Sequence, residues 1–162
     1  MIVIDNSSLI LMTKVGILYE ILKNLKKKLI ITNQIYNESA SKIDAFDAKI
    51  IKQRVEEKAI EKGEIKNVKL YEKIKEDFNL GKGEAEAVVF CLENKTGLIT
   101  DDKKAMNACR ILRIKFTTVP NLLIYVYKRD LITKTEANIY FMKLEKFGRY
   151  SNEILQKNQG GT

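Results

Sequence analysis

The stretch that decides the fold of this chain is Met1-Ile2-Val3-Ile4-Asp5-Asn6-Ser7-Ser8. Its branched apolar residues run without alternation into an aspartate. An apolar run of this kind is typical of a strand buried on both faces, as in a parallel sheet. Asp5 would then lie at the carboxyl end of the strand, which is the edge where open α/β sheets bind their ligands.

Strands and helices alternate along the rest of the chain. Further buried strands are predicted at residues 29–31, 98–100 and 116–119, with a short edge strand at 65–70. The main helical patterns cover residues 15–28, 44–62, 84–94, 103–112 and 133–147. This alternation predicts an α/β protein with a mainly parallel sheet.

Length and composition predict a single domain over residues 1–150, with a flexible tail at 151–162. We see neither a signal peptide nor an apolar run of membrane-spanning length, so we expect a cytoplasmic protein that does not bind membranes. Cys91 and Cys109 lie in apolar helical patterns and are interpreted as buried thiols. The chain has no histidine. This excludes histidine general bases and the usual zinc sites, so a bound metal would be a hard cation held by oxygen.

The chain has a formal net charge of +8. A basic surface attracts polyanions, and nucleic acid above all. A surface rich in lysine also serves solubility, so charge alone leaves both interpretations open.

Several acids occupy positions that call for an explanation. Asp101 and Asp102 follow a predicted strand directly, and two adjacent acids resist ionising together unless a cation lies near them. Glu84 falls on the apolar side of its helix, where a carboxylate is costly unless it is paired or bound to metal. Each acid also has a plainer interpretation, because aspartates cap helices and a first-turn glutamate complements the helix dipole. We infer that Asp5, Glu84 and the Asp101–Asp102 pair meet at one edge of the sheet and hold a divalent metal.

Four stretches resemble the motifs of the PIN domain family of metal-dependent ribonucleases. They are Ile4-Asp5-Asn6-Ser7-Ser8-Leu9-Ile10, Ile31-Thr32-Asn33-Gln34-Ile35-Tyr36-Asn37-Glu38, Gly81-Lys82-Gly83-Glu84-Ala85-Glu86-Ala87 and Leu98-Ile99-Thr100-Asp101-Asp102. The third is similar to a prokaryotic, toxin-type subgroup with a GEAEA stretch. The resemblance implies a three-layer α/β/α sandwich with roughly four or five strands. It also implies Mg²⁺ or Mn²⁺ as cofactor and endonucleolytic hydrolysis of RNA.

The resemblance also implies roles for individual residues. It gives catalytic roles to five acids, with metal binding at four of them: Asp5, Glu84, Asp102 and the adjacent Asp101. The fifth, Glu38, would bind a second metal or position water, and only the resemblance singles it out. The expected substrate contacts are Ser7, Thr100, Lys82, Lys103 and Lys104. Many relatives are toxins paired with an antitoxin protein, and a homodimer is among the assemblies left open.

The sequence departs from the subgroup at two places. Met106 follows Ala105 where an arginine is common, and Val119-Pro120-Asn121 replaces a turn that contains glycine. These departures concern substrate contacts more than the metal site.

Three other functions are weighed against this one. A non-catalytic RNA-binding module of the same fold would lack one or more of the acids. A phospho-acceptor receiver domain expects a lysine at the end of its last strand, where Val119 and Pro120 stand. A haloacid-type phosphatase needs an aspartate at position 7, which is a serine.

Overall fold

A computed structural model describes residues 1–41 and 45–148 of the chain. Within these residues, five strands form one sheet in which every pairing is parallel. The strands are β1 (Ile2–Ile4), β2 (Leu29–Thr32), β3 (Ile60–Gly63), β4 (Gly97–Ile99) and β5 (Phe116–Thr117). The helices are α1 (Asn6–Val15), α2 (Leu18–Asn24), α3 (Asn33–Ala40), α4 (Phe46–Glu56), α5 (Val68–Asp77), α6 (Lys82–Asn94), α7 (Lys103–Ile111), α8 (Val119–Lys128) and α9 (Lys134–Phe147).

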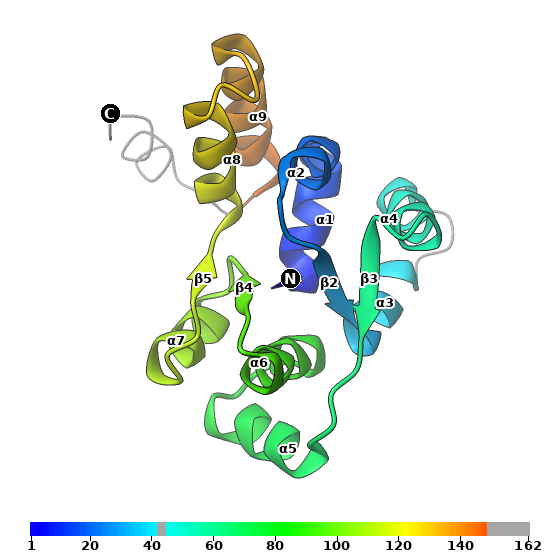
Figure 1. Cartoon of the computed structure of the whole chain (residues 1–162), viewed down its shortest axis with the longest axis vertical. Coiled ribbons are helices and arrows are strands. Elements are labelled where there is room, and N and C mark those ends of the chain that lie inside the picture. Colours follow the sequence, from blue (N-terminus) through cyan, green and yellow to red (C-terminus); the bar gives the residue numbers. More distant parts are fainter. Residues whose placement is uncertain (42–44, 149–162) are drawn as a thin grey trace.

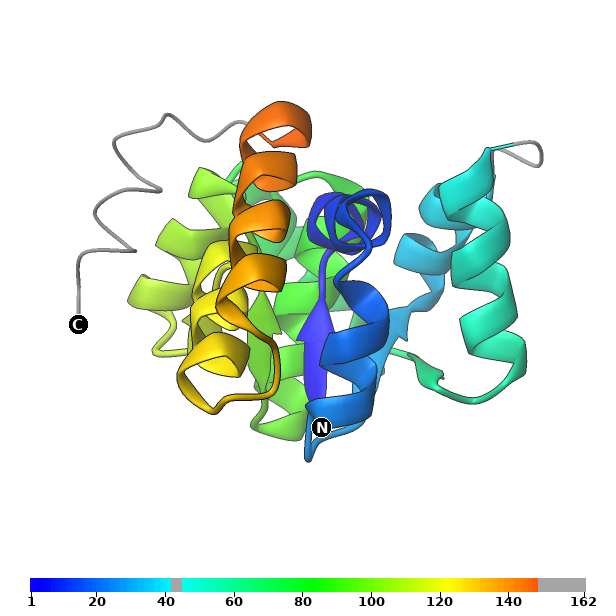
Figure 2. The same cartoon turned by 90° about the horizontal axis from the view of Figure 1, so that it is seen from above.

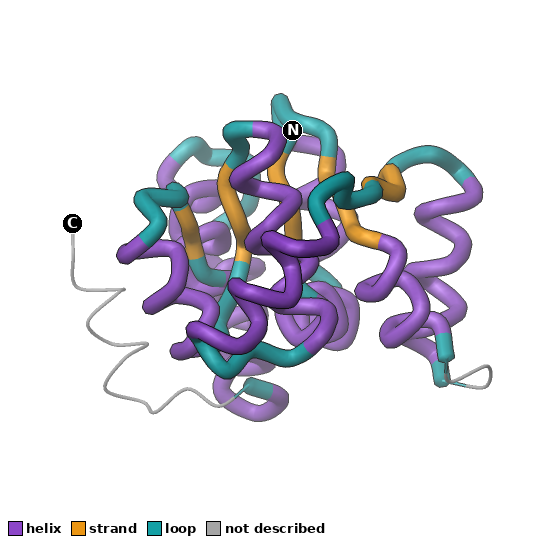
Figure 3. The backbone as a smooth tube through the Cα atoms, turned by 90° about the horizontal axis from the view of Figure 1, so that it is seen from below, coloured by secondary structure: helices purple, strands orange, loops and turns teal. Residues whose placement is uncertain are grey.

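The helices and the sheet form three layers, which confirms the expected α/β/α sandwich. Helices α1, α2, α8 and α9 cover one face of the sheet, and α6 and α7 cover the other, with α5 packed against α6 (Figure 1). Helices α3 and α4 lie beside β3. Seen from above, α9 lies next to α1 and α8 (Figure 2). The tube in Figure 3 shows the strands side by side between these helices.

The strand order is β3-β2-β1-β4-β5, so the first strand lies at the centre of the sheet. The chain moves outward from β1 to β3, and then returns to the other side of β1 to form β4 and β5. Ligands of open α/β sheets bind where the order reverses, which here is between β1 and β4. In this register Ile4 is opposite Ile99, so Asp5 and Thr100 leave the sheet side by side.

Covering the sheet on both faces explains why the central strands β1, β2 and β4 are largely apolar runs. The side chains of Ile4, Ile31 and Ile99 are fully buried. Both cysteines are buried free thiols, as expected. None of the helices in the described parts of the chain is long and apolar enough to span a membrane.

The prediction of one helix over residues 44–62 was wrong. Helix α4 ends at Glu56, and the chain then turns through Lys58, which has a positive φ of 60°, into strand β3. Beyond β3, the predicted edge strand at 65–70 was also wrong, because helix α5 begins at Val68. The Asn67 side chain caps this helix by accepting a hydrogen bond from the Leu70 N–H at 2.9 Å. Residues 42–44 lie outside the described part of the chain.

The prediction of one helix over residues 15–28 was also wrong. Gly16, with a φ of +86°, ends α1, and α2 begins at Leu18. Glycine adopts this left-handed conformation without the steric cost that other residues incur. The predicted tail at 151–162 lies outside the described residues.

Candidate metal centre at the carboxyl edge of the sheet

The Asp5 carboxylate lies where β1 ends and α1 begins, and it is almost fully buried, with 1% of its surface exposed. Its Oδ1 accepts hydrogen bonds from the Ser8 N–H at 2.7 Å and from the Ser7 hydroxyl at 3.2 Å. Its Oδ2 accepts a hydrogen bond from the Thr100 hydroxyl. Burial raises the pKa of Asp5 from 3.8 to about 6, although these hydrogen bonds oppose the rise. The Asp5 carboxylate therefore caps helix α1 and is also poorly solvated.

Glu84 lies in the first turn of α6 and is partly buried. Its Oε2 accepts a hydrogen bond from the Gly81 N–H at 2.8 Å, so the carboxylate caps its own helix. Burial raises the pKa of Glu84, and the nearby negative charge of Asp102 adds to this effect. The positive charge of Lys104 acts in the opposite direction, so both residues lie within electrostatic reach of Glu84.

Glu38, on α3, lies directly against Gly83 of α6. A Cβ atom built on Gly83 would lie 2.8 Å from Oε2 of Glu38, which is too close for any real contact. The other carboxylate oxygen, Oε1, accepts a hydrogen bond from the Gln34 amide at 3.0 Å. Glycine at position 83 is therefore what allows the Glu38 carboxylate to reach α6.

These three acids line one small hollow of about 110 Å³ at the carboxyl edge of the sheet. Its other lining residues are Asn6, Ser7, Gly81, Lys82 and Gly83. Within the described part of the chain, none of the three carboxylates forms an ion pair. The structure thus brings together acids that are far apart in the sequence, and none of the three has an ion-pair partner among the described residues.

The paired aspartates point to different places, and neither lines the hollow. Asp102 caps α7, because its Oδ1 accepts hydrogen bonds from the Lys104 N–H at 2.8 Å and the Ala105 N–H at 2.9 Å. Asp101 accepts hydrogen bonds from the Ser8 hydroxyl at 2.8 Å and the Val119 N–H at 3.2 Å. Asp101 therefore links α1 to the start of α8, whereas Asp102 remains close enough to influence Glu84.

The expected substrate contacts are distributed unevenly around the hollow. Ser7 and Lys82 line it. The ammonium group of Lys104 donates a hydrogen bond to the Asn79 carbonyl oxygen at 3.2 Å. Lys103 is exposed and does not line the hollow, and Thr100 is fully buried beneath Asp5. Thr100 thus contacts Asp5 instead of facing solvent.

Two residues that hold the site together were not assigned roles from the sequence. Asn6 lines the hollow, and its Oδ1 accepts a hydrogen bond from the buried Ser39 hydroxyl at 2.6 Å, which joins α1 to α3. Glu86 accepts a hydrogen bond from the Gln34 N–H at 2.8 Å, which joins α6 to α3. The position of Asn6 directly after Asp5 was an available signal. The role of Glu86 was not visible in the sequence, because it depends on the contact between two helices.

The donor atoms of these residues suit a hard divalent cation. Three carboxylate oxygens accept no hydrogen bond from the described residues: Oε2 of Glu38, Oε1 of Glu84 and Oδ2 of Asp102. Carboxylate oxygens are the ligands that Mg²⁺ and Mn²⁺ prefer. Across residues 1–41 and 45–148, however, no three acidic side chains are close enough together to form a ready-made ligand set. The chemistry therefore fits a metal, while the carboxylates of Asp5, Glu84 and Asp102 act as helix caps.

Comparisons with known proteins identify the family. A family model described as DUF3368, a PIN domain, matches residues 1–158. The crystal structure of PAE2754 from Pyrobaculum aerophilum is similar in fold, with a TM-score of 0.57. The two chains are 14% identical over 78% of this chain and 96% of that one, so this likeness concerns the fold alone. No curated protein matches the sequence significantly. Because the family model spans nearly the whole chain, this protein belongs to the PIN domain family.

Proposed function

We propose that this protein is a metal-dependent endoribonuclease that hydrolyses RNA phosphodiester bonds at the acidic hollow. The observation that carries the proposal is the convergence of Asp5, Glu38 and Glu84 on one hollow, with no ion-pair partner among the described residues. Uncompensated carboxylates repel one another, and a divalent cation removes that repulsion. Membership of the PIN domain family, whose members are typically nucleases, supports the same conclusion.

Asp5, Glu84 and Asp102 would hold the cation, with Glu38 facing them from α3. Asp101, the neighbour of Asp102, would act by orienting α1 against α8. When bound, Mg²⁺ or Mn²⁺ supplies the charge that lowers the pKa of water and neutralises the phosphate. The buried Asp5 would resist protonation once a cation lies beside it, because the positive charge lowers its pKa.

The neighbouring polar and basic residues would position the RNA. Ser7 lines the hollow, and its hydroxyl, which donates a hydrogen bond to Asp5, would orient water or a phosphate oxygen there. Lys82, Lys103 and Lys104 are exposed at the starts of α6 and α7, and they would contact the RNA backbone. Contacts of this kind weaken as salt rises.

The deciding experiment compares RNA cleavage by the parent protein with cleavage by Asp5→Asn, Glu38→Gln and Glu84→Gln. We expect cleavage that requires Mg²⁺ or Mn²⁺ and stops in EDTA, with a loss of at least about a hundredfold in each variant. Glu145→Gln is the matched control, because it neutralises an exposed acid on α9. If Asp5→Asn still cuts RNA at the parental rate, the proposed mechanism is wrong.

A non-catalytic RNA-binding module is the second candidate. The observation that favours it is the lack of a ready-made ligand set within the described residues. Calorimetry with MgCl₂ and MnCl₂ separates the two functions, since only the nuclease requires a bound metal. RNA binding without measurable metal binding would establish the second candidate.

The proposal extends to a toxin that is restrained by an antitoxin protein. Expression of the parent chain would then arrest growth, whereas Asp5→Asn would not. A small protein encoded beside it would relieve the arrest and co-purify with the chain. Growth arrest that persists in Asp5→Asn would separate toxicity from RNA cleavage and contradict this extension.

A further inference from the structure

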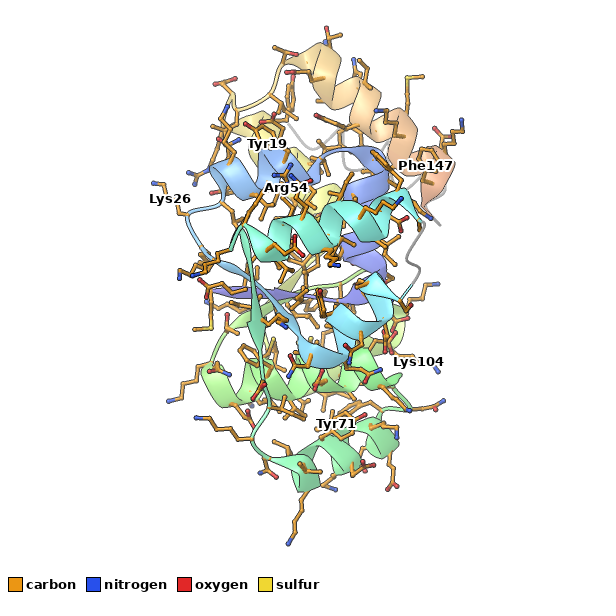
Figure 4. The ribbon with its side chains drawn as sticks, turned by 90° about the vertical axis from the view of Figure 1, so that its right-hand side faces the viewer. Tyr19, Lys26, Arg54, Tyr71, Lys104 and Phe147 are labelled. Carbon is orange, nitrogen blue, oxygen red and sulfur yellow. The ribbon has the colours of Figure 1, made fainter. Side chains whose placement is uncertain are left out.

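The amino edge of the sheet, opposite the acidic hollow, is strongly basic. Lys26 and Lys27 lie in the loop between α2 and β2, where the central strands begin. Lys104, beside the acidic hollow, lies on the opposite side of the molecule from Lys26 (Figure 4). The run of lysines that begins at position 26 therefore cannot contact a phosphate bound at the acids.

Three hollows adjoin along this amino edge, with volumes of about 810, 640 and 540 Å³. The first and third share Ile2, Lys27 and Thr117 in their walls. The second and third share Lys26, Tyr125 and Arg129, among others. Because neighbouring hollows share walls, they form one continuous surface.

Seven cationic side chains line this surface, and all seven are exposed. The largest hollow is lined by Lys27, Lys95, Arg113 and Lys115, and the other two add Lys23, Lys26 and Arg129. We call these seven residues the amino-edge track. No described aspartate or glutamate lines any of the three hollows.

The positive charge of the track is not neutralised by neighbouring carboxylates. Among the described residues, none of the seven forms an ion pair, whereas the adjacent Lys28 pairs with Glu61. Uncompensated cations on a continuous surface raise the local concentration of anions.

Helix ends account for only part of this charge. Helices α2, α6 and α7 end at this edge, and cations stabilise the last turn of a helix. This explains Lys23, in the last turn of α2, and Lys95, at the end of α6. It does not explain Lys26, Lys27 and Lys115, which belong to no helix.

An exposed aromatic ring lies within the track. Tyr125 is 39% exposed, and the Arg129 guanidinium lies 4.5 Å from the centre of its ring. Proteins that bind single-stranded nucleic acid combine a basic surface with aromatic and arginine side chains on which bases stack. An acidic peptide would use the charges but would not need the ring.

We propose that the amino-edge track binds single-stranded RNA through its phosphates, with Tyr125 and Arg129 stacking on a base. An RNA whose scissile bond lies at the acidic hollow would continue around the molecule to the opposite edge. The choice of RNA as the ligand rests on the proposed function. The inference that the track binds an anionic ligand rests only on its charge and its shape. Long RNA would then be held more tightly than a fragment that reaches only one edge.

The test compares Lys26→Glu/Lys27→Glu with the matched control Lys49→Glu/Lys52→Glu. The control changes the net charge equally, on exposed lysines of α4 that lie outside the track. Binding of an unstructured, labelled RNA of about 30 nucleotides is measured by fluorescence anisotropy over a salt series in EDTA. No cleavage is needed for this readout, so the result is independent of the metal.

We expect the track variant to bind on the order of tenfold more weakly at low salt, and its salt slope to fall by about 1.4. The control should retain most of its affinity and the parental slope. Tyr125→Ala should weaken binding further than Tyr125→Phe, because only phenylalanine preserves the stacking face.

Three outcomes would overturn the inference. The first is equal weakening by the track and control variants. The second is a lower Tm with unchanged affinity, which would assign Lys26 and Lys27 to the stability of the fold and not to RNA binding. The third is binding of polyglutamate as tight as that of RNA and in competition with it, which would identify an acidic protein as the partner. A further outcome separates the two proposals. If the parent protein binds RNA through the track but never cleaves it with Mg²⁺ or Mn²⁺, the inference about the track is correct and the proposed nuclease function is wrong.

Discussion

The Asp5 carboxylate meets two requirements that conflict. It caps α1 in a fully packed environment, and it must carry a negative charge if it is to hold a cation. Burial raises its pKa from 3.8 to about 6, so the folded protein binds this proton more tightly than the unfolded chain does. The resulting stabilisation is complete below about pH 4 and is lost as the pH rises through about 6.

Asp5→Asn should therefore stabilise the metal-free protein at neutral pH, because the amide keeps the shape of the side chain but never ionises. From the shift to about 6, we expect a gain of up to about 3 kcal/mol in the free energy of unfolding above pH 7. The gain should shrink toward zero near pH 4. Urea unfolding in EDTA across this pH range measures it, and a difference that does not change with pH would refute the explanation.

Gly83→Ala should weaken metal binding without lowering the stability of the protein. Alanine is favoured over glycine in a helix by about 1 kcal/mol, so the Tm should stay level or rise. The added Cβ would lie 2.8 Å from Oε2 of Glu38 and push that carboxylate away. We expect weaker Mg²⁺ binding by calorimetry. In a Glu38→Ala background, Gly83→Ala should not change the affinity for Mg²⁺. If Gly83→Ala weakens Mg²⁺ binding equally in that background, Glu38 is not the cause.

At the scale of elements, α6 supplies caps for its neighbours as well as for itself. Helix α3 begins after Thr32, whose side chain makes no capping hydrogen bond. Glu86 of α6 accepts the hydrogen bond from the Gln34 N–H instead. Glu93, at the other end of α6, accepts hydrogen bonds from the Lys66 and Asn67 N–H groups at 3.0 and 2.7 Å, where α5 begins. One helix thus fixes the starts of two others.

Glu86→Ala should both weaken the fold and misplace Glu38, since α3 carries that carboxylate. We expect a loss of about 1 kcal/mol in the free energy of unfolding, typical of a lost cap, together with weaker Mg²⁺ binding. Glu86→Gln keeps an acceptor oxygen and should restore most of both. Glu93→Ala is the matched control and should cost similar stability with no change in metal binding. A loss of metal affinity in Glu93→Ala would show that the effect is not specific to α3.

At the scale of the whole molecule, the acidic hollow and the amino-edge track lie at opposite edges of the sheet. Acids line the hollow at the carboxyl edge, and cations line the surface at the amino edge. The separation arises because parallel strands place all their carboxyl ends at one edge. Helices that return antiparallel to the strands then place their own carboxyl ends at the other edge.

Mg²⁺ should stabilise the whole fold, because a cation that binds only the folded hollow shifts the unfolding equilibrium. At a concentration one hundred times its Kd, the gain is about 2.7 kcal/mol. Thermal unfolding should show a Tm that rises with MgCl₂ and returns in EDTA, with no rise in Asp5→Asn/Glu84→Gln. If NaCl at the same ionic strength raises the Tm equally, the effect is screening of charge repulsion and not binding of Mg²⁺ at a site.

The sequence alone determined the strands β1, β2 and β4, together with the acids that follow β1 and β4. It also located β5, but the strand predicted at 116–119 was too long, because β5 ends at Thr117 and helix α8 begins at Val119. β1, β2 and β4 are short, largely buried apolar runs, and this pattern is local, whereas β5 has only two residues, both of them half-buried. Strand β3 could not be predicted in the same way. Its residues Ile60–Gly63 continue the charged pattern of α4, and they form a strand because they pair with β2. The close packing of Phe90 against Gly63, where an added Cβ would lie 2.4 Å from the ring, is equally a tertiary contact.

The tertiary structure alone decided which acids meet. Family resemblance singled out Glu38, but its place against Gly83 depends on the docking of α3 onto α6. The divergence of Asp101 toward α8 and Asp102 toward α7 depends on which backbone N–H groups lie nearby. A sequence pattern shows how one segment buries its apolar residues. The free energy of that burial is set mainly within the segment, so it can be predicted locally. The position of a carboxylate in space depends on contacts between segments that are distant in the chain, and only the folded arrangement sets those.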